Sequence, residues 1–502
     1  MGTIVTKDHP ENGAGLKRCF GLKESITITV GTVIGVGLFT VGGNVAGMMG
    51  PGVFWATLAA LAVSVYPSML YAEMSAALPF AGGTYQYASL GLGELWGMLA
   101  GWNFIISMAA VASGEALAFS FYMRTLFEGL GISIPLGDTA LACAAAGAFL
   151  LLSVRGAELT GRMQNGFLFF FWGVAAVWLV SILPSLDNSV FAEGMTAEIG
   201  GFLPAAAMIW WCFAGFETCC AMGEEIRCPQ KNLPRALMLA PFIVFAVNGF
   251  FQWALLCIAD SSGLGKVAEA AAPFAEGMKQ AGLTGLPLIL LCAGVAFGGD
   301  FSTLNASMSA PARYLYTMAR EGNAPAIFSR IHPVYRTPWI ASLGLGALVL
   351  LLIGTGSIAY IASLSLFATL FYYVIGIAAA WGLRRRRPEL ERPYRAPFFK
   401  VGVPVSMAVY LLMMTQLDRG GILAGIIWCA LGLGYYLLGK RGTGKGILRG
   451  ETRPLPDLPP LPPLPGEEEL FQLDREFRRW RNVVAAAVFL VIALYLIMYL
   501  TA

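Results

Sequence analysis

The chain has 502 residues, of which 57% are hydrophobic and only 13% are charged. A chain this apolar is not expected to be a soluble protein or a soluble enzyme, and we predict a polytopic membrane protein. The formal net charge of +3 gives no reason to expect a nucleic-acid partner.

Cysteine and histidine usage argues against disulfide and metal chemistry. The nine cysteines lie mostly inside apolar segments and form no CxxC pair. We therefore expect small buried thiols and not a disulfide framework. The two histidines, His9 and His332, stand in the N-terminal tail and beside a proline. No metal, no cofactor and no catalytic site is expected, and the polar first 23 residues do not resemble a cleavable signal peptide.

Thirteen apolar runs are long enough to cross about 30 Å of hydrocarbon. They are residues 22–48, 52–78, 96–126, 138–154, 161–184, 200–225, 236–260, 286–320, 338–356, 358–383, 401–417, 421–439 and 482–500. The first twelve follow one another closely, and the thirteenth is set apart by a long tail.

The first span contains Gly31, Gly35 and Gly37 within seven residues. Lipid offers no partner to loose backbone groups, so a helix that breaks in mid-membrane is costly unless the break faces a cavity. This stretch is therefore a candidate binding site. The alternative is that the glycines only allow close packing between helices.

The sixth span contains a matching interruption at Gly215 and Glu217. Paired interruptions in two inverted halves indicate a binding site near the membrane midplane. Freed amides and the positive dipole end of the first span can hold a carboxylate, while freed carbonyls of both spans can hold an ammonium group. A site with both groups suits an amino acid or a related amine.

The segment between the last two spans differs in composition from the rest. Residues 454–465 are proline-rich and predict a stiff, extended stretch. Residues 471–481 are basic and amphipathic, which suits an anionic membrane surface. Two interpretations of the tail and the last span stay open: a peripheral extra helix without a transport role, or a docking site for a protein partner.

The basic residues predict the orientation. With a cytoplasmic N-terminus, 29 of the 33 lysines and arginines lie inside, and only Arg124, Lys266, Lys279 and Arg419 lie outside. The positive-inside rule therefore predicts a multi-pass protein of the plasma (inner) membrane with its N-terminus in the cytoplasm.

A series of motifs follows the first glycine stretch in order. They lie at residues 71–75 (Tyr-Ala-Glu-Met-Ser), 79–85 (Pro-Phe-Ala-Gly-Gly-Thr-Tyr), 215–217 (Gly-Phe-Glu), 224–235 and 313–322. Over residues 15–440 the chain resembles the amino acid–polyamine–organocation superfamily of permeases. The resemblance implies an all-α polytopic membrane protein with the inverted five-plus-five helix repeat of leucine-transporter-type carriers. Helices 1 and 6 would be discontinuous, and helices 11, 12 and an extra C-terminal helix 13 would follow.

This architecture divides the chain into six regions. They are a cytoplasmic tail at 1–21, the first repeat at 22–184, the second repeat at 200–383, helices 11 and 12 at 401–439, a cytoplasmic linker at 440–481 and the last helix at 482–502.

The resemblance also implies a substrate site. The amides of Val36 and Gly37 would meet the carboxylate of the substrate, and the carbonyls of Val33, Trp211 and Ala214 would meet its amine. An aromatic side chain near Trp211 would close over the substrate. The remaining residues of the expected site are Gly35, Cys212, Phe213, Gly215 and Ser307.

Three acids inside the apolar spans are candidates for proton or cation coupling: Glu217, Asp300 and Glu115. Glu217 resembles the helix-6 acid with which some relatives sense protons, but a structural acid that bonds to freed backbone is equally expected. Asp300 and Glu115 would form an acidic outer vestibule that favours a cationic substrate, or would be satisfied by bonds between helices.

Sodium or lysine-based coupling has less support. Some proton-coupled relatives carry a lysine in the fifth span in place of a sodium ion, and the aligned residue here is Phe171. Ser302 and Thr303 are either remnants of a sodium site or hydroxyls bonded to backbone.

The expected function is secondary transport of an amino acid or related amine by alternating access, as a symporter or an exchanger. Two alternatives stay open: a membrane-embedded sensor of amino acids, and a carrier for amines or polyamines that lack a carboxylate.

Overall fold

The computed structural model describes residues 18–192, 199–440, 462–463 and 465–501. The described residues form helices and no strand. Expectations about the first 17 residues and about most of the proline-rich stretch concern residues outside the described ranges.

The first glycine-rich span is broken, as predicted. It forms α1 (Leu22–Gly31), a turn, a π-helical segment η1 (Gly37–Gly42) and α2 (Gly43–Met49). The other helices of the first half are α3 (Val53–Ala77), α4 (Gly83–Gly91), α5 (Glu94–Gly129), α6 (Asp138–Arg155), α7 (Ala157–Ile182) and the short α8 (Ser189–Ala192).

The sixth span is also broken, into α9 (Ile199–Trp211), a turn, and the 3₁₀ segments η4 (Phe216–Ala221) and η5 (Gly223–Glu225). There follow α10 (Pro229–Ile258), α11 (Leu264–Glu269), α12 (Pro273–Gln280), α13 (Leu286–Gly294), the π-helical η7 (Val295–Asp300), α14 (Phe301–Arg320) and η8 (Ala326–Ser329). The last helices are α15 (Trp339–Ile353), α16 (Ile358–Arg386), α17 (Phe399–Met414), α18 (Arg419–Lys440) and α19 (Glu467–Thr501).

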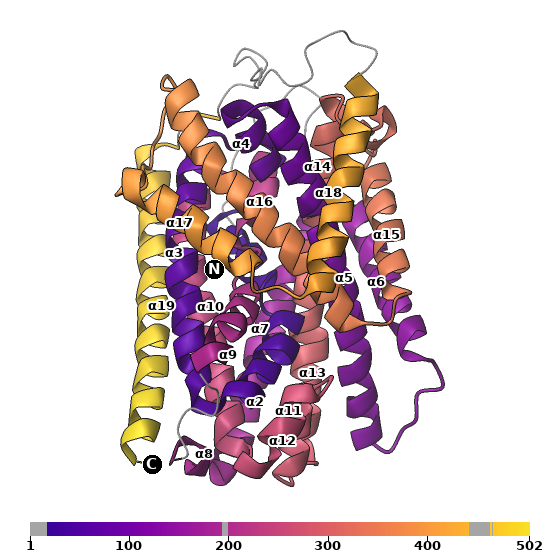
Figure 1. The fold of residues 1–502 in the computed structure, drawn as a ribbon, viewed down its shortest axis with the longest axis vertical. Helices are drawn as coiled ribbons and strands as arrows, with labels where there is room; N and C mark the ends of the chain where they lie inside the picture. Colours follow the sequence, from indigo (N-terminus) through magenta and orange to yellow (C-terminus); the bar gives the residue numbers. More distant parts are fainter. Residues whose placement is uncertain (1–17, 193–198, 441–461, 464, 502) are drawn as a thin grey trace.

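Among the described residues, 10 helices are long and apolar enough to cross a membrane, and α15 and α17 are shorter apolar helices. The predicted all-α polytopic fold with breaks in the first and sixth spans is confirmed. The two broken helices pack against each other, and α3, α7, α10 and α14 contact them. Figure 1 shows the long helices running side by side along the length of the molecule.

The C-terminal helix α19 is continuous from Glu467 to Thr501, so the basic segment at 471–481 forms the first part of this helix. One face of α19 lies against α10, where Val491 fills the space beside Gly249. The ring of Tyr495 packs 4.5 Å from that of Phe54 in α3. Figure 1 shows α19, in yellow, along the outer edge of the bundle.

Candidate functional site

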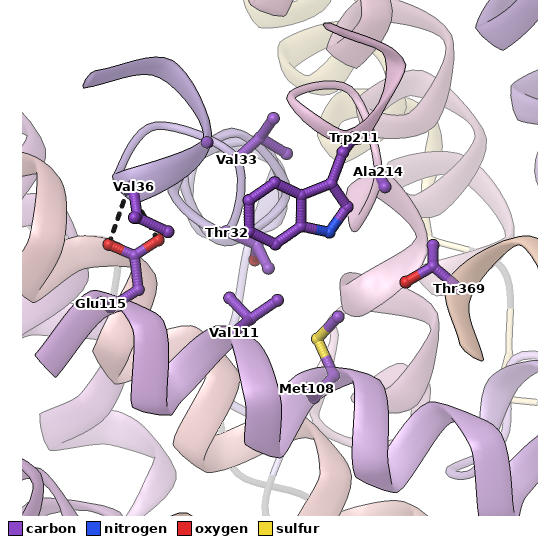
Figure 2. Close-up of a pocket in the computed structure, with 10 residues that line it drawn as sticks. Thr32, Val33, Val36, Met108, Val111, Glu115, Trp211, Ala214 and Thr369 are labelled. Atoms are coloured by element: carbon purple, nitrogen blue, oxygen red, sulfur yellow. Dashed lines mark hydrogen bonds between the residues drawn. The ribbon is translucent and has the colours of Figure 1, made fainter. Parts of the chain in front are cut away.

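The break after α1 frees backbone groups that side chains then satisfy. The amides of Thr32 and Ile34 still bond to carbonyls within α1, at 3.0 and 3.2 Å. The amide of Val36 instead donates to both carboxyl oxygens of Glu115, at 3.0 and 2.9 Å (Figure 2). A carboxylate therefore caps the positive end of the segment that follows the break.

Glycine at position 35 makes this contact feasible. Glu115 extends from α5 and is buried. A Cβ atom on Gly35 would lie 2.4 and 2.5 Å from the two carboxyl oxygens and 2.6 Å from Oγ1 of Thr303. These distances are far shorter than van der Waals contact, so the approach of Glu115 requires a residue without a side chain.

Asp300, at the end of η7, is fully buried, and its carboxyl group lies close enough to that of Glu115 for the two to interact electrostatically. Neither oxygen of Asp300 accepts a bond from a donor in the described part of the chain. Two carboxyl groups bond to each other only when one carries a proton. The acids thus form a buried pair between α5 and η7, and the acidic vestibule that the sequence suggested stays a prediction.

The break after α9 lies against the first one. Gly215 adopts φ = +103°, a conformation that favours glycine, and its amide donates to the hydroxyl of Tyr373 at 3.3 Å. The thiol of Cys212 donates to the carbonyl of Gly37 at 2.9 Å. The two interruptions therefore form one continuous irregular region in the centre of the bundle.

A cavity of about 20 Å³ lies between the two breaks. Its lining residues are Thr32, Val33, Val36, Gly37, Met108, Val111, Glu115, Trp211, Ala214 and Thr369 (Figure 2). A space of this size holds about one water molecule. The amino acid that the resemblance implies therefore fits only if the surrounding helices move apart.

Five residues of the site implied by the resemblance line this cavity: Val33, Val36, Gly37, Trp211 and Ala214. Gly35 does not line the cavity and lies against Glu115 and Thr303. Cys212, Phe213 and Gly215 belong to the second break but do not line the cavity. Ser307 is buried in α14 and donates to the carbonyls of Thr303 and Leu304 within its own helix. The roles of these residues stay predictions.

Sequence reasoning did not find Thr32, Met108, Val111 and Thr369, which also line the cavity. Met108 and Val111 belong to α5, and Thr369 belongs to α16. Both helices are largely buried, so no polar face marks the side that meets the substrate.

Trp211 is the largest side chain of the cavity wall, and a hydroxyl cluster holds it. Its indole N–H donates to Ser365 in α16 at 3.2 Å. Ser107 of α5 lies 3.3 Å from Ser365 and 2.6 Å from Thr369. The indole of the second break is thereby anchored to two of the helices that surround it.

The residue of the fifth span that contacts the first break is Gln164, and the alignment of Phe171 with the lysine of some relatives stays a prediction. The amide nitrogen of Gln164 donates to Ser302 at 2.7 Å and to the carbonyl of Thr27 at 3.1 Å. Phe171 lies two turns further along α7, where it packs against Phe39 and Gly298.

The hydroxyls proposed as remnants of a sodium site donate to backbone carbonyls. Thr303 donates to Gly31 at 2.8 Å and to Ile34 at 3.0 Å, and Ser302 donates to Gly31 at 3.3 Å. These bonds satisfy carbonyls that the break in α1 frees.

Glu217 is fully buried in η4 and accepts hydrogen bonds from the hydroxyls of Tyr372 and Tyr373, neighbours in α16. Each oxygen has its own donor, and this arrangement stabilises an ionised carboxylate. Glu217 therefore ties the second break to α16.

Ion pairs close the end of the bundle that carries most of the arginines. Arg313 and Glu225 are both buried and form two bonds of 3.0 Å. Arg320 pairs with Glu224 at 3.5 Å. These pairs connect α14 to the segment after the second break, so the site opens toward this end only if they separate.

A family model described as "Amino acid permease" matches residues 20–432. An uncharacterized transporter of Mycobacterium tuberculosis is 31% identical over 430 residues, which cover 83% of this chain and 91% of the relative. A branched-chain amino acid permease of Bacillus subtilis is 25% identical, with 85% and 94% covered. A serine/threonine exchanger of the same organism is 29% identical, with 78% and 89% covered. This chain is a member of the amino acid permease family of membrane transporters.

Proposed function

We propose that the protein is a proton-coupled secondary carrier of neutral amino acids that works by alternating access. The observation that carries the proposal is the contact between Glu115 and the amide of Val36 at the cavity. Glu115 holds the position that the family resemblance gives to the carboxylate of the substrate. A substrate carboxylate and Glu115 would therefore compete for the same donor.

This competition gives a mechanism for coupling. Burying two adjacent anions without a cation beside them is costly, so Glu115 and Asp300 hold a shared proton most readily when both are enclosed. Protonation of Glu115 weakens its bond to the amide of Val36, because a neutral carboxyl group is a poorer acceptor than a carboxylate. The carboxylate of the substrate then takes the amide, and the proton and the amino acid cross together.

The rest of the cavity supports a neutral side chain. The cavity wall is largely apolar, with the side chains of Met108, Val111 and Trp211, and Thr369 adds one hydroxyl. Among the described residues, no lysine or arginine lines the cavity. Two relatives are named for branched-chain amino acids and for serine and threonine, whereas a third, from Arabidopsis thaliana, is named for cationic amino acids.

A second candidate substrate is an amine without a carboxylate. Glu115 is a carboxyl group that lines the cavity, and it would meet an ammonium group directly. In this case Glu115 would stay on the amide of Val36 throughout the cycle. The two candidates differ in what the loss of the charge of Glu115 does to binding.

Glu115→Gln separates them in proteoliposomes. Glutamine keeps an oxygen acceptor for Val36 but cannot exchange a proton. We expect uptake driven by a pH gradient to be lost, while exchange of labelled for unlabelled neutral amino acid is retained. Glu128→Gln, an exposed acid on the same helix, serves as the matched control. If uptake by Glu115→Gln in a pH gradient matched that of the wild type, the coupling role would be refuted. If the variant no longer bound any amine, the second candidate would be favoured.

We also propose that the protein lies in the plasma (inner) membrane with a cytoplasmic N-terminus, on the strength of its basic residues. Cysteines introduced just after the end of α16, near Arg387, and near Lys266 should label from opposite sides of the membrane. A sensing role would require that ligand binds without transport. Uptake by protein truncated after residue 440 would argue against a sensor that needs its tail, and a protein partner at the tail stays a hypothesis.

A further inference from the structure

A second cavity, of about 320 Å³, is much larger than the one at the breaks. It is enclosed by α5, α14, the segment through η8, α15 and α18. Trp102 and Trp428 form part of its wall and stack with ring centroids 4.6 Å apart. Each indole N–H donates to the backbone carbonyl of the other residue, at 3.0 and 3.2 Å. Both indole N–H groups therefore have acceptors, and the rings present apolar faces to the cavity.

The cavity reaches from the interior of the bundle to its outer surface. Met318 and Leu345 are buried, whereas Tyr435 is 40% exposed and Pro325 is exposed. Both α15 and α18 otherwise present exposed apolar side chains, as Leu351 does with 74% exposure. The surface around the opening is thus the one that faces hydrocarbon.

Hydrocarbon is the medium that fills such a space. Water finds almost no partner on these walls, and a void would forfeit the dispersion contacts of its lining. A cavity of several hundred Å³ is large enough for a bound small molecule or part of a lipid tail.

One buried polar atom at this cavity lacks a partner. Asn323 is 4% exposed, and its amide nitrogen donates to the hydroxyl of Tyr85 at 2.9 Å. Tyr85 in turn donates to Glu321 at 2.7 Å, so the orientation of the amide is fixed by this chain of bonds. Oδ1 of Asn323 then accepts no bond within the described residues. It is an acceptor for a hydroxyl donor of a ligand.

A basic residue follows one of the lining residues closely in the sequence. Arg330 is exposed and follows Phe328, a lining residue, by two positions. A basic side chain beside a cavity between membrane helices suits an anionic lipid head group.

We propose that this cavity binds an anionic phospholipid whose head group carries hydroxyls, such as phosphatidylglycerol. One acyl chain enters between α15 and α18, the phosphate lies near Arg330, and a head-group hydroxyl donates to Asn323. The lipid would thereby contact the chain of bonds through Tyr85 to Glu321, next to the residue that pairs with Glu224. This binding site does not depend on the proposed transport function.

Photo-crosslinking tests the site directly. The probe is phosphatidylglycerol with a diazirine in its acyl chain, added to purified full-length protein in phosphatidylcholine vesicles. We expect labels on residues of α15 and α18 that line the cavity. Leu348→Trp fills the cavity and should lower this labelling about tenfold, since it excludes at least two methylene groups. Leu351→Trp, on the lipid-facing side of the same helix, should label like the wild type. Equal labelling of the two variants, or labels confined to other helices, would overturn the proposal.

The head group is tested with probes that share one tail. We expect phosphatidylglycerol to label the cavity more strongly than phosphatidic acid, and both more strongly than phosphatidylcholine. Arg330→Gln should remove the preference for the two anionic lipids. Equal labelling by all three would overturn the head-group assignment. The readout needs no transport, so its failure is distinct from failure of the proposed function.

Discussion

Two buried glutamates lie at the two helix breaks, and their surroundings differ. Glu115 receives one backbone amide and faces a second acid, Asp300. Glu217 receives two tyrosine hydroxyls, one on each oxygen. Within the described ranges, the carboxyl group of Glu115 thus accepts from a single donor, whereas that of Glu217 accepts from one donor on each oxygen.

This difference indicates a division of labour between the breaks. In the proposed mechanism, the break at α1 holds an acid whose bond to Val36 is exchanged for that of a substrate. The break at α9 holds an acid that fixes backbone geometry by binding to α16. Glu217 is therefore better explained as a structural acid, one of the two roles that its sequence left open, and Glu115 is the better candidate for coupling.

The strongest test of this contrast is Gly35→Ala. The added methyl would overlap both oxygens of Glu115 and Oγ1 of Thr303, so we expect destabilisation of about 1–3 kcal/mol and loss of uptake. Thermal unfolding in detergent and uptake in proteoliposomes measure both effects. Gly166→Ala is the control, since a Cβ there meets nothing within 4 Å. Normal uptake by Gly35→Ala would show that Glu115 need not approach the break.

Glu217→Gln should affect stability without affecting coupling. Both tyrosine hydroxyls lose a charged acceptor, and one of them then faces an amide nitrogen, so we expect a loss of about 1–3 kcal/mol in the unfolding free energy. The pH dependence of uptake should remain that of the wild type. A flattened pH profile, as expected for Glu115→Gln, would assign the coupling role to the second break instead.

Removing the hydroxyl of either tyrosine should lower the unfolding free energy by a smaller amount than Glu217→Gln does. Tyr373 bonds to both Glu217 and the amide of Gly215, whereas Tyr372 bonds only to Glu217. We expect Tyr373→Phe to cost about 1–2 kcal/mol and Tyr372→Phe about 1 kcal/mol. Thermal unfolding of both variants side by side measures the difference. If Tyr372→Phe cost more, the amide of Gly215 would not depend on Tyr373.

The positions of the breaks could be predicted from the sequence because glycine is costly in a membrane helix. Gly31, Gly35, Gly37 and Gly215 mark both interruptions, and the structure places both there. The physical rule is local, so it needs no knowledge of neighbouring helices.

The partners of the breaks could not be predicted in the same way. Which face of α5 meets Val36 depends on how a helix that is buried on nearly every side is rotated. The same holds for α7, where the sequence does not show that Gln164 faces the first break. Gln164, which contacts the first break, and Phe171, which packs against other aromatic rings, are separated by only about two helical turns.

The late position of α19 in the chain has a consequence for biogenesis. This helix lies beyond the matched family region, yet it covers α10 and fills the space beside Gly249. It is synthesised after α10, so newly inserted α10 first meets lipid on this face and exchanges it for protein once α19 has been made. Assembly therefore includes a separate docking step for α19, in which the hydroxyl of Tyr499 donates to the carbonyl of Pro51 at 2.9 Å.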